Sequence, residues 1–157
     1  MGRAVHVGVI GAGECSEAVY GTALKVGAEI ARQGWVLISG GLGGVMEAAA
    51  KGCKEAGGTT VGILPGLVRE AANPHITIPL ATGLGEGRNI LVVRASDALI
   101  AIAGGYGTLS EIAFGLKLEK PVIGLDTWKD IRGVQYASSP EEAVQMVIRV
   151  LSSVRSL

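Results

Sequence analysis

Short apolar runs alternate along the chain with longer segments in which apolar residues recur every three or four positions. The runs are rich in β-branched residues and predict strands at 5–10, 35–39, 59–64, 76–80, 98–103 and 122–125. The periodic segments predict helices at 16–33, 45–56 and 88–96, a helix that ends near 118, and a last helix that begins at Ser139. Strands that are apolar on both faces and alternate with helices indicate an open parallel sheet covered on both sides. We therefore predict a doubly wound α/β fold in a single domain over residues 1–157.

Local signals support individual boundaries of these elements. Gly34 follows the first predicted helix and is a typical residue just beyond a helix C-terminus. The last helix is expected to begin with a capping box, in which Ser139 is the N-cap, Pro140 the first helical residue and Glu142 the third. Pro79 lies within the fourth predicted strand, and this position predicts an edge strand or a bend.

The composition limits the class of protein. The chain has 157 residues, with 14 basic and 14 acidic residues, so a broad surface for a nucleic-acid polymer is not expected. The two cysteines show no CxxC spacing and predict neither a zinc site nor a disulfide framework. No apolar run approaches the roughly 20 residues of a membrane span. We expect a cytoplasmic protein with no bound metal.

The chain has 25 glycines, and glycine-rich loops follow the first, second and fifth predicted strands. In a parallel sheet these loops gather at the carboxyl ends of the strands, where ligands of such folds bind. We therefore predict a site for a phosphorylated small molecule at this edge. Its candidate residues are Gly11, Gly13, Gly40, Gly41, Gly43, Gly44, Gly104, Gly105, Tyr106, Gly107 and Thr108.

The first two loops each allow two interpretations. Gly11 and Gly13 do not extend to GxGxxG, because the sixth position is Ser16, and the second strand ends in Ser39 rather than an acid. A dinucleotide site of that type is not predicted, and the loop is either a tight turn or an anion contact. The loop at 40–44 leads directly into a predicted helix N-terminus, which suits a phosphate. Packing of helix on sheet is the alternative.

The third loop, at 103–108, precedes a possible capping box in which Glu111 would turn back to the Thr108 amide. That interpretation leaves the glycines unexplained, whereas an anion site accounts for them. Tyr106 within this loop is a candidate for covering a base. Arg88 is the cation that we expect at the same edge, where Glu111 could polarise a sugar hydroxyl or stabilise positive charge at an anomeric carbon.

Residues 103–111, AGGYGTLSE, resemble the PGGxGTxxE signature of the Lonely Guy superfamily, with Ala103 in place of the proline. The resemblance extends over most of the chain and implies a Rossmann-like fold and a homo-oligomer, a dimer or a tetramer. Some members are phosphoribohydrolases that release the base from a nucleoside 5′-monophosphate. In those enzymes an arginine and the signature glutamate are catalytic, and these map onto Arg88 and Glu111.

A second branch of the superfamily gives a different functional expectation. Residues 34–66 look closer to the molybdenum cofactor carrier proteins, and Asn89 follows Arg88 where the phosphoribohydrolase pattern has lysine. This branch implies storage or delivery of a pterin that carries a phosphate, with molybdoenzyme assembly factors as partners. We therefore predict a binding protein for the molybdenum cofactor, and phosphoribohydrolase activity is the alternative.

Overall fold

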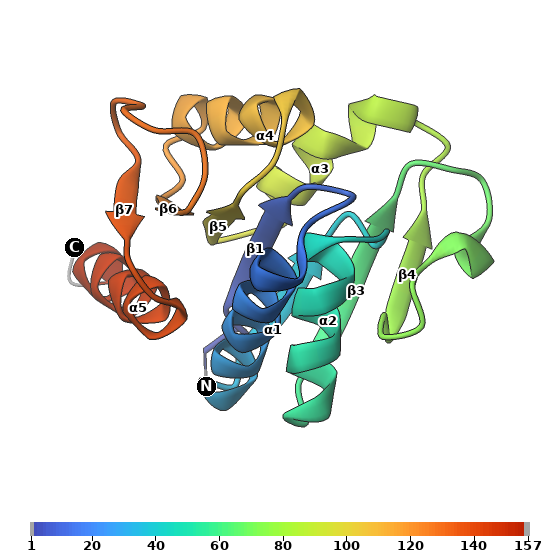
Figure 1. Cartoon of the computed structure of the whole chain (residues 1–157), viewed down its shortest axis with the longest axis horizontal. Coiled ribbons are helices and arrows are strands. Elements are labelled where there is room, and N and C mark those ends of the chain that lie inside the picture. The colour runs from blue at the N-terminus through green and yellow to red at the C-terminus, as the bar shows by residue number, and fades with distance from the viewer. Residues whose placement is uncertain (1, 156–157) are drawn as a thin grey trace.

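The computed structural model describes residues 2–155. Seven strands form one sheet, and in chain order they are β1 (His6–Gly11), β2 (Val36–Ser39), β3 (Thr59–Leu64), β4 (Ile78–Ala81), β5 (Ala98–Ile102), β6 (Val122–Leu125) and β7 (Gln135–Ala137) (Figure 1). The helices are α1 (Glu17–Arg32), α2 (Val45–Glu55), α3 (Asn89–Arg94), α4 (Tyr106–Lys117) and α5 (Pro140–Arg155), with short 3-10 helices η1 (Arg69–Ala71) and η2 (Gly85–Arg88).

All strand pairs are parallel, and the order across the sheet is β4-β3-β2-β1-β5-β6-β7. The chain builds outward from β1 to β4 and then returns to place β5 on the other side of β1. Gly11 at the end of β1 lies opposite Ile102 at the end of β5, so the loops after these strands begin side by side. This is the point where the strand order reverses, and it is where ligands of doubly wound sheets bind.

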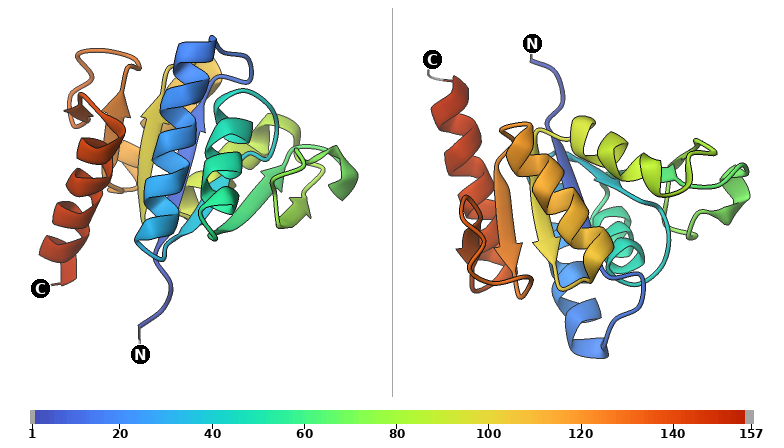
Figure 2. Two further views of the ribbon diagram at one scale, coloured as in Figure 1. Left: turned by 60° about the horizontal axis from the view of Figure 1, so that its bottom comes forward. Right: turned by 90° about the horizontal axis from the view of Figure 1, so that it is seen from above.

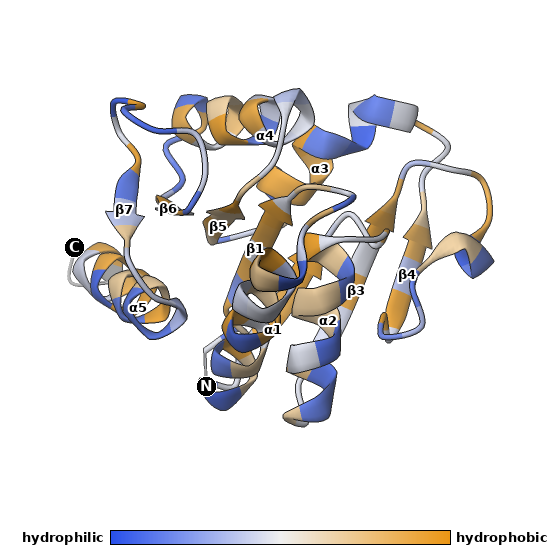
Figure 3. Ribbon diagram, viewed as in Figure 1, coloured by the Kyte–Doolittle hydropathy of each residue, from blue (hydrophilic) through white to orange (hydrophobic). Residues whose placement is uncertain are grey.

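Helices cover both faces of the sheet, as the two views in Figure 2 show. Val7 and Val9 of β1 pack with α1, α2 and α5, whereas Ile10 faces the core beneath α3 and α4. β1 therefore buries side chains on both faces, and Figure 3 shows hydrophobic residues along β1, β3 and β5. The Rossmann-like doubly wound α/β fold predicted from the sequence is confirmed.

Helices α1 and α2 pack with their backbones in unusually close contact. A Cβ atom on Gly27 would collide with the carbonyl oxygen of Ala49, and one on Gly52 would collide with that of Leu24. The two glycines thus set the distance between the helices that follow β1 and β2. The loops that begin these helices are held at a fixed separation as a result.

Several local predictions are confirmed and some elements were missed. Pro79 lies in β4, which is an edge strand as expected. The Ser139 hydroxyl accepts a hydrogen bond from the Glu142 amide, but the Glu142 carboxylate accepts from Ser138 rather than completing the capping box. The strand β7 was not predicted, because its three residues, Gln135–Ala137, are too few to form an apolar run of the kind that predicts a strand. Of the helices in the described range, none is both long and apolar enough to cross a membrane.

Candidate functional site

A crevice of about 300 Å³ lies at the carboxyl ends of β1 and β5. Three segments form most of its walls, namely residues 11–13 at the end of β1, residues around η2, and the first turns of α4, and Met46 and Pro65 complete the lining. These segments are distant in sequence and meet because the strand order reverses at β1 and β5. The crevice contains one buried cation, Arg88, and one buried acid, Glu111.

The loop after β1 is supported from behind by the glycine-rich loop that follows β2. The Val45 amide donates to the Ala12 carbonyl at 2.9 Å, and a side chain on Gly44 would collide with that same carbonyl. Gly11 and Gly13 line the crevice, whereas Gly40, Gly41, Gly43 and Gly44 do not. In the structure the 40–44 loop therefore supports residues that line the crevice.

The loop after β5 has an unusual backbone. Ala103 has a φ of 50° and Gly104 a φ of 99°, both in the left-handed region. The Ala103 amide donates to the Asp126 carbonyl at 3.0 Å, and the Thr127 hydroxyl donates to the Ala103 carbonyl at 2.6 Å. Proline cannot adopt this φ and has no amide to donate. The alanine in place of the signature proline thus belongs to a loop conformation that proline would not permit.

Helix α4 begins earlier than the capping-box interpretation required. Gly105 is its N-cap residue, no side chain caps the helix, and Thr108 already lies within the first turn. The predicted capping box of Thr108 and Glu111 is therefore wrong. Gly105, Gly107 and Thr108 line the crevice at this helix N-terminus, where free amides and the helix dipole favour an anion.

Arg88 ends η2, and its side chain is only 9% exposed. Its Nη1 donates to Asn89 Oδ1 at 2.6 Å, and its guanidinium packs on Gly40, where a Cβ would lie 2.7 Å from Nη2. Among the described residues, Arg88 Nε is the buried side-chain nitrogen or oxygen atom without a hydrogen-bond partner. Burial lowers the pKa of Arg88, and the nearby Glu111 opposes that effect. A buried cationic donor without a partner is costly unless a further group satisfies it.

Glu111 lies on the face of α4 that turns toward the crevice, and it is 6% exposed. Burial raises its pKa to about 7, and the charge of Arg88 only partly opposes the effect of burial. The Glu111 carboxyl group is therefore protonated in a substantial fraction of the molecules at neutral pH. In this form Glu111 can donate a hydrogen bond as well as accept one.

Tyr106 does not line the crevice and is 83% exposed. Its ring lies 5.7 Å from that of Trp128, centroid to centroid, and Trp128 Nε1 donates to the Gly105 carbonyl at 3.0 Å. Trp128 thus holds the N-cap residue of α4 in place. The sequence pattern does not indicate this contact, since Trp128 and Gly105 lie 23 residues apart.

Some of the residues predicted for the site line the crevice and others do not. The structure brings Gly11, Gly13, Arg88, Gly105, Gly107, Thr108 and Glu111 together, and it leaves Gly104 outside the lining. Residues that the prediction missed are Ala12, Met46, Pro65, Gly85, Glu86 and Asn89. The position of Gly85, Glu86 and Asn89 directly beside Arg88 was the signal that could have identified three of them.

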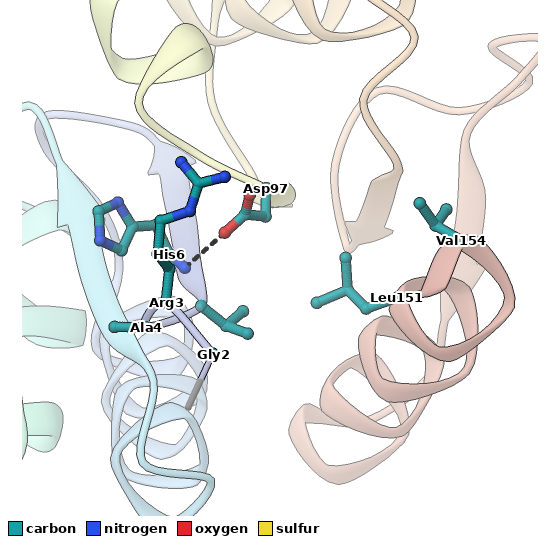
Figure 4. Close-up of a pocket in the computed structure, with 8 residues that line it drawn as sticks. Gly2, Arg3, Ala4, His6, Asp97, Leu151 and Val154 are labelled. Carbon is teal, nitrogen blue, oxygen red and sulfur yellow. Dashed lines mark hydrogen bonds between the residues drawn. The ribbon is translucent and has the colours of Figure 1, made fainter. Parts of the chain in front are cut away.

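A larger cavity, about 880 Å³, lies at the opposite ends of the strands (Figure 4). It is lined by the N-terminal segment and by Leu151 and Val154 of α5. Two of its polar residues are paired, since the His6 amide donates to Asp97 Oδ2 at 2.8 Å and His6 Nδ1 lies 3.0 Å from the Ala95 carbonyl. The crevice that contains Arg88 combines a buried cation with a buried acid, and it is the candidate functional site. No group of three or more His, Cys, Asp or Glu residues that could hold a metal occurs within the described range.

The fold and the crevice define a Rossmann-like α/β protein with glycine loops at the switch point of its sheet. The sequence profile of the SLOG cluster4 family matches residues 4–154, and the chain belongs to this family. The structure is similar to that of the molybdenum cofactor binding protein from Rippkaea orientalis, with a TM-score of 0.90, 38% identity and coverage of 96% of this chain and 99% of that one.

Two further proteins are similar to this chain, one for each of the two functions expected from the sequence. The molybdenum cofactor carrier protein of Chlamydomonas reinhardtii matches with a TM-score of 0.88 and 36% identity, over 96% of this chain and 99% of that one. A cytokinin riboside 5′-monophosphate phosphoribohydrolase of Mycobacterium tuberculosis is 33% identical over 122 residues, which are 72% of this chain and 65% of that enzyme. The resemblance to the Lonely Guy superfamily and its carrier branch is thus confirmed.

Proposed function

We propose that the protein binds a small phosphorylated ligand, the molybdenum cofactor, in the crevice at the switch point and carries it without chemical change. The observation that supports this proposal most directly is the buried Arg88, whose Nε has no partner in the described chain. The Arg88 side chain lines the crevice and forms no ion pair in the described chain, so an anionic group of a ligand would pair with its charge. The likeness to cofactor-binding proteins over nearly the whole chain supports the choice of ligand.

The crevice residues divide the recognition of such a ligand among them. The amides at the start of α4, near Gly105 and Gly107, and the Thr108 hydroxyl would hold the phosphate, while Arg88 supplies a fixed positive charge. Protonated Glu111 would donate a hydrogen bond to a ring or sugar oxygen instead of repelling the phosphate. The pterin carries the chemistry of the cofactor, and the protein supplies binding and orientation.

A second candidate function is hydrolysis of a nucleoside 5′-monophosphate to a free base and ribose 5-phosphate. It is favoured by the presence of Arg88 and Glu111 in one crevice and by the similarity to a phosphoribohydrolase. The ionised fraction of Glu111 would stabilise an oxocarbenium-like transition state. Burial reduces that fraction at neutral pH, and Asn89 supplies no second cation beside Arg88. We therefore place this function second.

The two functions are separated by two measurements on the same preparation. In the first, the protein is dialysed against molybdenum cofactor released from a molybdoenzyme under anaerobic conditions, and the retained pterin is quantified by its fluorescence after oxidation. In the second, it is incubated with nucleoside monophosphates and free base is quantified by chromatography. Saturable retention of the cofactor without base release supports the carrier. Base release that is lost in Glu111→Gln, without retention of the cofactor, would establish the hydrolase instead.

We also propose that the carrier is a cytoplasmic homo-oligomer, a dimer or a tetramer, that delivers its ligand to molybdoenzyme assembly factors. The resemblance to the carrier branch supports this part of the proposal. Light scattering coupled to size-exclusion chromatography measures the mass directly, and a mass of 16.0 kDa, that of one chain, would contradict the oligomer.

A further inference from the structure

Three hydrogen bonds in series connect Arg88 to the first turn of α4. Arg88 Nη1 donates to Asn89 Oδ1 at 2.6 Å, and Asn89 Nδ2 donates to Ser110 Oγ at 3.4 Å. The Ser110 hydroxyl then donates to the Gly107 carbonyl at 2.6 Å. The series therefore begins at the buried cation and ends at a residue that lines the crevice.

Each group in the series has a fixed role as donor or acceptor. A guanidinium only donates, so Asn89 must present its carbonyl oxygen to Arg88 and its amide group to Ser110. The Ser110 hydroxyl has one proton, and this proton is directed to Gly107. The Asn89 side chain cannot rotate by half a turn without placing two donors opposite each other. The series thus permits a single orientation of the Asn89 amide, which presents its oxygen to the guanidinium.

Gly40 packs against the same guanidinium. A Cβ at that position would lie 2.8 Å from both Nη1 and the central carbon of Arg88, so the planar group rests directly on the backbone of the loop after β2. No acidic side chain forms an ion pair with Arg88 among the described residues. Neutral groups hold the cation, and its charge remains available to a ligand.

We propose that Asn89 and Ser110 are positioning residues that fix the Arg88 guanidinium relative to the start of α4 before a ligand binds. The cation and the amides near Gly105 and Gly107 then act on the same anionic group. A site that is organised in advance avoids the entropy of ordering a long side chain on binding. The identity of that anion rests on the proposed function, whereas the positioning is a property of the ligand-free protein.

The test without ligand uses the carboxyl group of Glu111 as a reporter, because Arg88 lowers its pKa. Its pKa is measured by carbon NMR in the wild type and in Arg88→Met, Asn89→Ala, Ser110→Ala and Ser110→Thr. We expect Arg88→Met to raise the pKa, and Asn89→Ala and Ser110→Ala to raise it by about 0.5 or more as the guanidinium leaves its fixed position. Ser110→Thr keeps the hydroxyl and should restore the wild-type value.

The exposed Arg94 on the same helix as Asn89 provides the control, since Arg94→Met removes a charge without touching the series. If the pKa of Glu111 is the same in Asn89→Ala, Ser110→Ala and the wild type, the positioning role is wrong. The same conclusion follows if Arg88→Met leaves that pKa unchanged, because the guanidinium is then not held near Glu111, where the series of hydrogen bonds would place it.

A second test uses the molybdenum cofactor itself. Asn89→Ala and Ser110→Ala should weaken its binding by about tenfold, the loss of one charge-assisted hydrogen bond, with Ser110→Thr near the wild type. If the wild type does not bind the cofactor, the proposed function is wrong and the NMR result still decides the positioning. If Arg88→Met binds the cofactor as tightly as the wild type, the role of Arg88 in binding it is wrong. If Arg88→Met loses binding but Asn89→Ala and Ser110→Ala do not, the function stands and the positioning role is wrong.

Discussion

Arg88 and Glu111 lie in one crevice as a buried cation and a buried acid that act on each other without forming an ion pair in the described chain. The positive charge lowers the pKa of Glu111, but burial has the larger effect and raises it to about 7. Each side chain therefore remains able to form an ion pair or a hydrogen bond with a ligand. This relationship determines the first two predictions.

The free energy of unfolding should depend on pH through Glu111. The folded protein holds a proton on this group up to a pKa of about 7, whereas the ordinary value is 4.5. The stabilisation is complete below 4.5 and is lost as the pH rises through 7, and its size is on the order of 3 kcal/mol. Glu111→Gln should remove this loss, which denaturant unfolding at a series of pH values would measure.

Glu142 offers a contrast, since its hydrogen bonds from Ser138 lower the pKa of an exposed carboxylate. Its stabilising effect is lost as the pH falls, which is the opposite direction. Glu142→Gln should therefore leave the loss of stability between pH 4.5 and 7 intact. If Glu111→Gln still loses stability between pH 4.5 and 7 as the wild type does, another group titrates in that range.

Arg88→Met should separate ligand affinity from stability. Replacing a buried cation that forms no ion pair in the described chain, and whose Nε has no hydrogen-bond partner, by an apolar side chain of similar length is expected to leave the melting temperature unchanged or raise it. Binding of the phosphorylated ligand should weaken by about tenfold or more, because a charge-assisted hydrogen bond is lost. Thermal unfolding and equilibrium dialysis measure the two effects. A variant that binds normally would contradict the assigned role of Arg88.

Ala103 should respond in opposite directions to glycine and proline. Ala103→Gly relieves a left-handed backbone and is expected to raise the free energy of unfolding by about 1 kcal/mol. Ala103→Pro is expected to lower it by about 3 kcal/mol or more, because proline cannot reach this φ and cannot donate to Asp126. Denaturant unfolding of both variants is the measurement. Equal stability of Ala103→Pro and the wild type would mean that the loop adopts a different backbone.

Trp128→Phe should affect the start of α4. The substitution keeps an aromatic ring beside Tyr106 but removes the donor to the Gly105 carbonyl. We expect stability to fall by only about 1 kcal/mol, while ligand affinity falls severalfold because the crevice loses a fixed wall. Trp35→Phe, in a residue that packs against the core on the α1 side, is the matched control for affinity. Equal effects on affinity would exclude a specific role for Trp128.

Gly52→Ala should destabilise the protein through the contact between α1 and α2. The added methyl group would meet the Leu24 carbonyl, and the helices must separate, at a cost of about 2–3 kcal/mol. Gly21→Ala in α1 meets no atom within 4 Å and should stabilise by about 0.5–1 kcal/mol through helix propensity. Thermal unfolding of the two variants tests whether the close contact of the helices, or the loss of a glycine as such, determines the change in stability.

The sequence determined the parallel α/β class and the edge at which the glycine loops meet. A continuous apolar run such as 98–103 is typical of a strand that is covered on both faces. The strand β5 is buried along its whole length, as this pattern predicts. The signature at 103–111 also identified residues near the crevice. Both signals are local in the chain, because they depend on periodicity and on the order of a few residue types.

Only the tertiary structure decided which of these residues share a crevice. The pairing of β5 with β1 brings residues 11–13 beside α4, and the packing of Arg88 on Gly40 joins segments that are almost 50 positions apart. The same packing explains why a residue without a side chain occupies position 40 in the glycine-rich loop at 40–44, which the sequence alone could not show. Burial of Arg88 and Glu111, and with it the raised pKa of Glu111, follows from contacts between distant elements. Such contacts leave no periodic pattern in the chain.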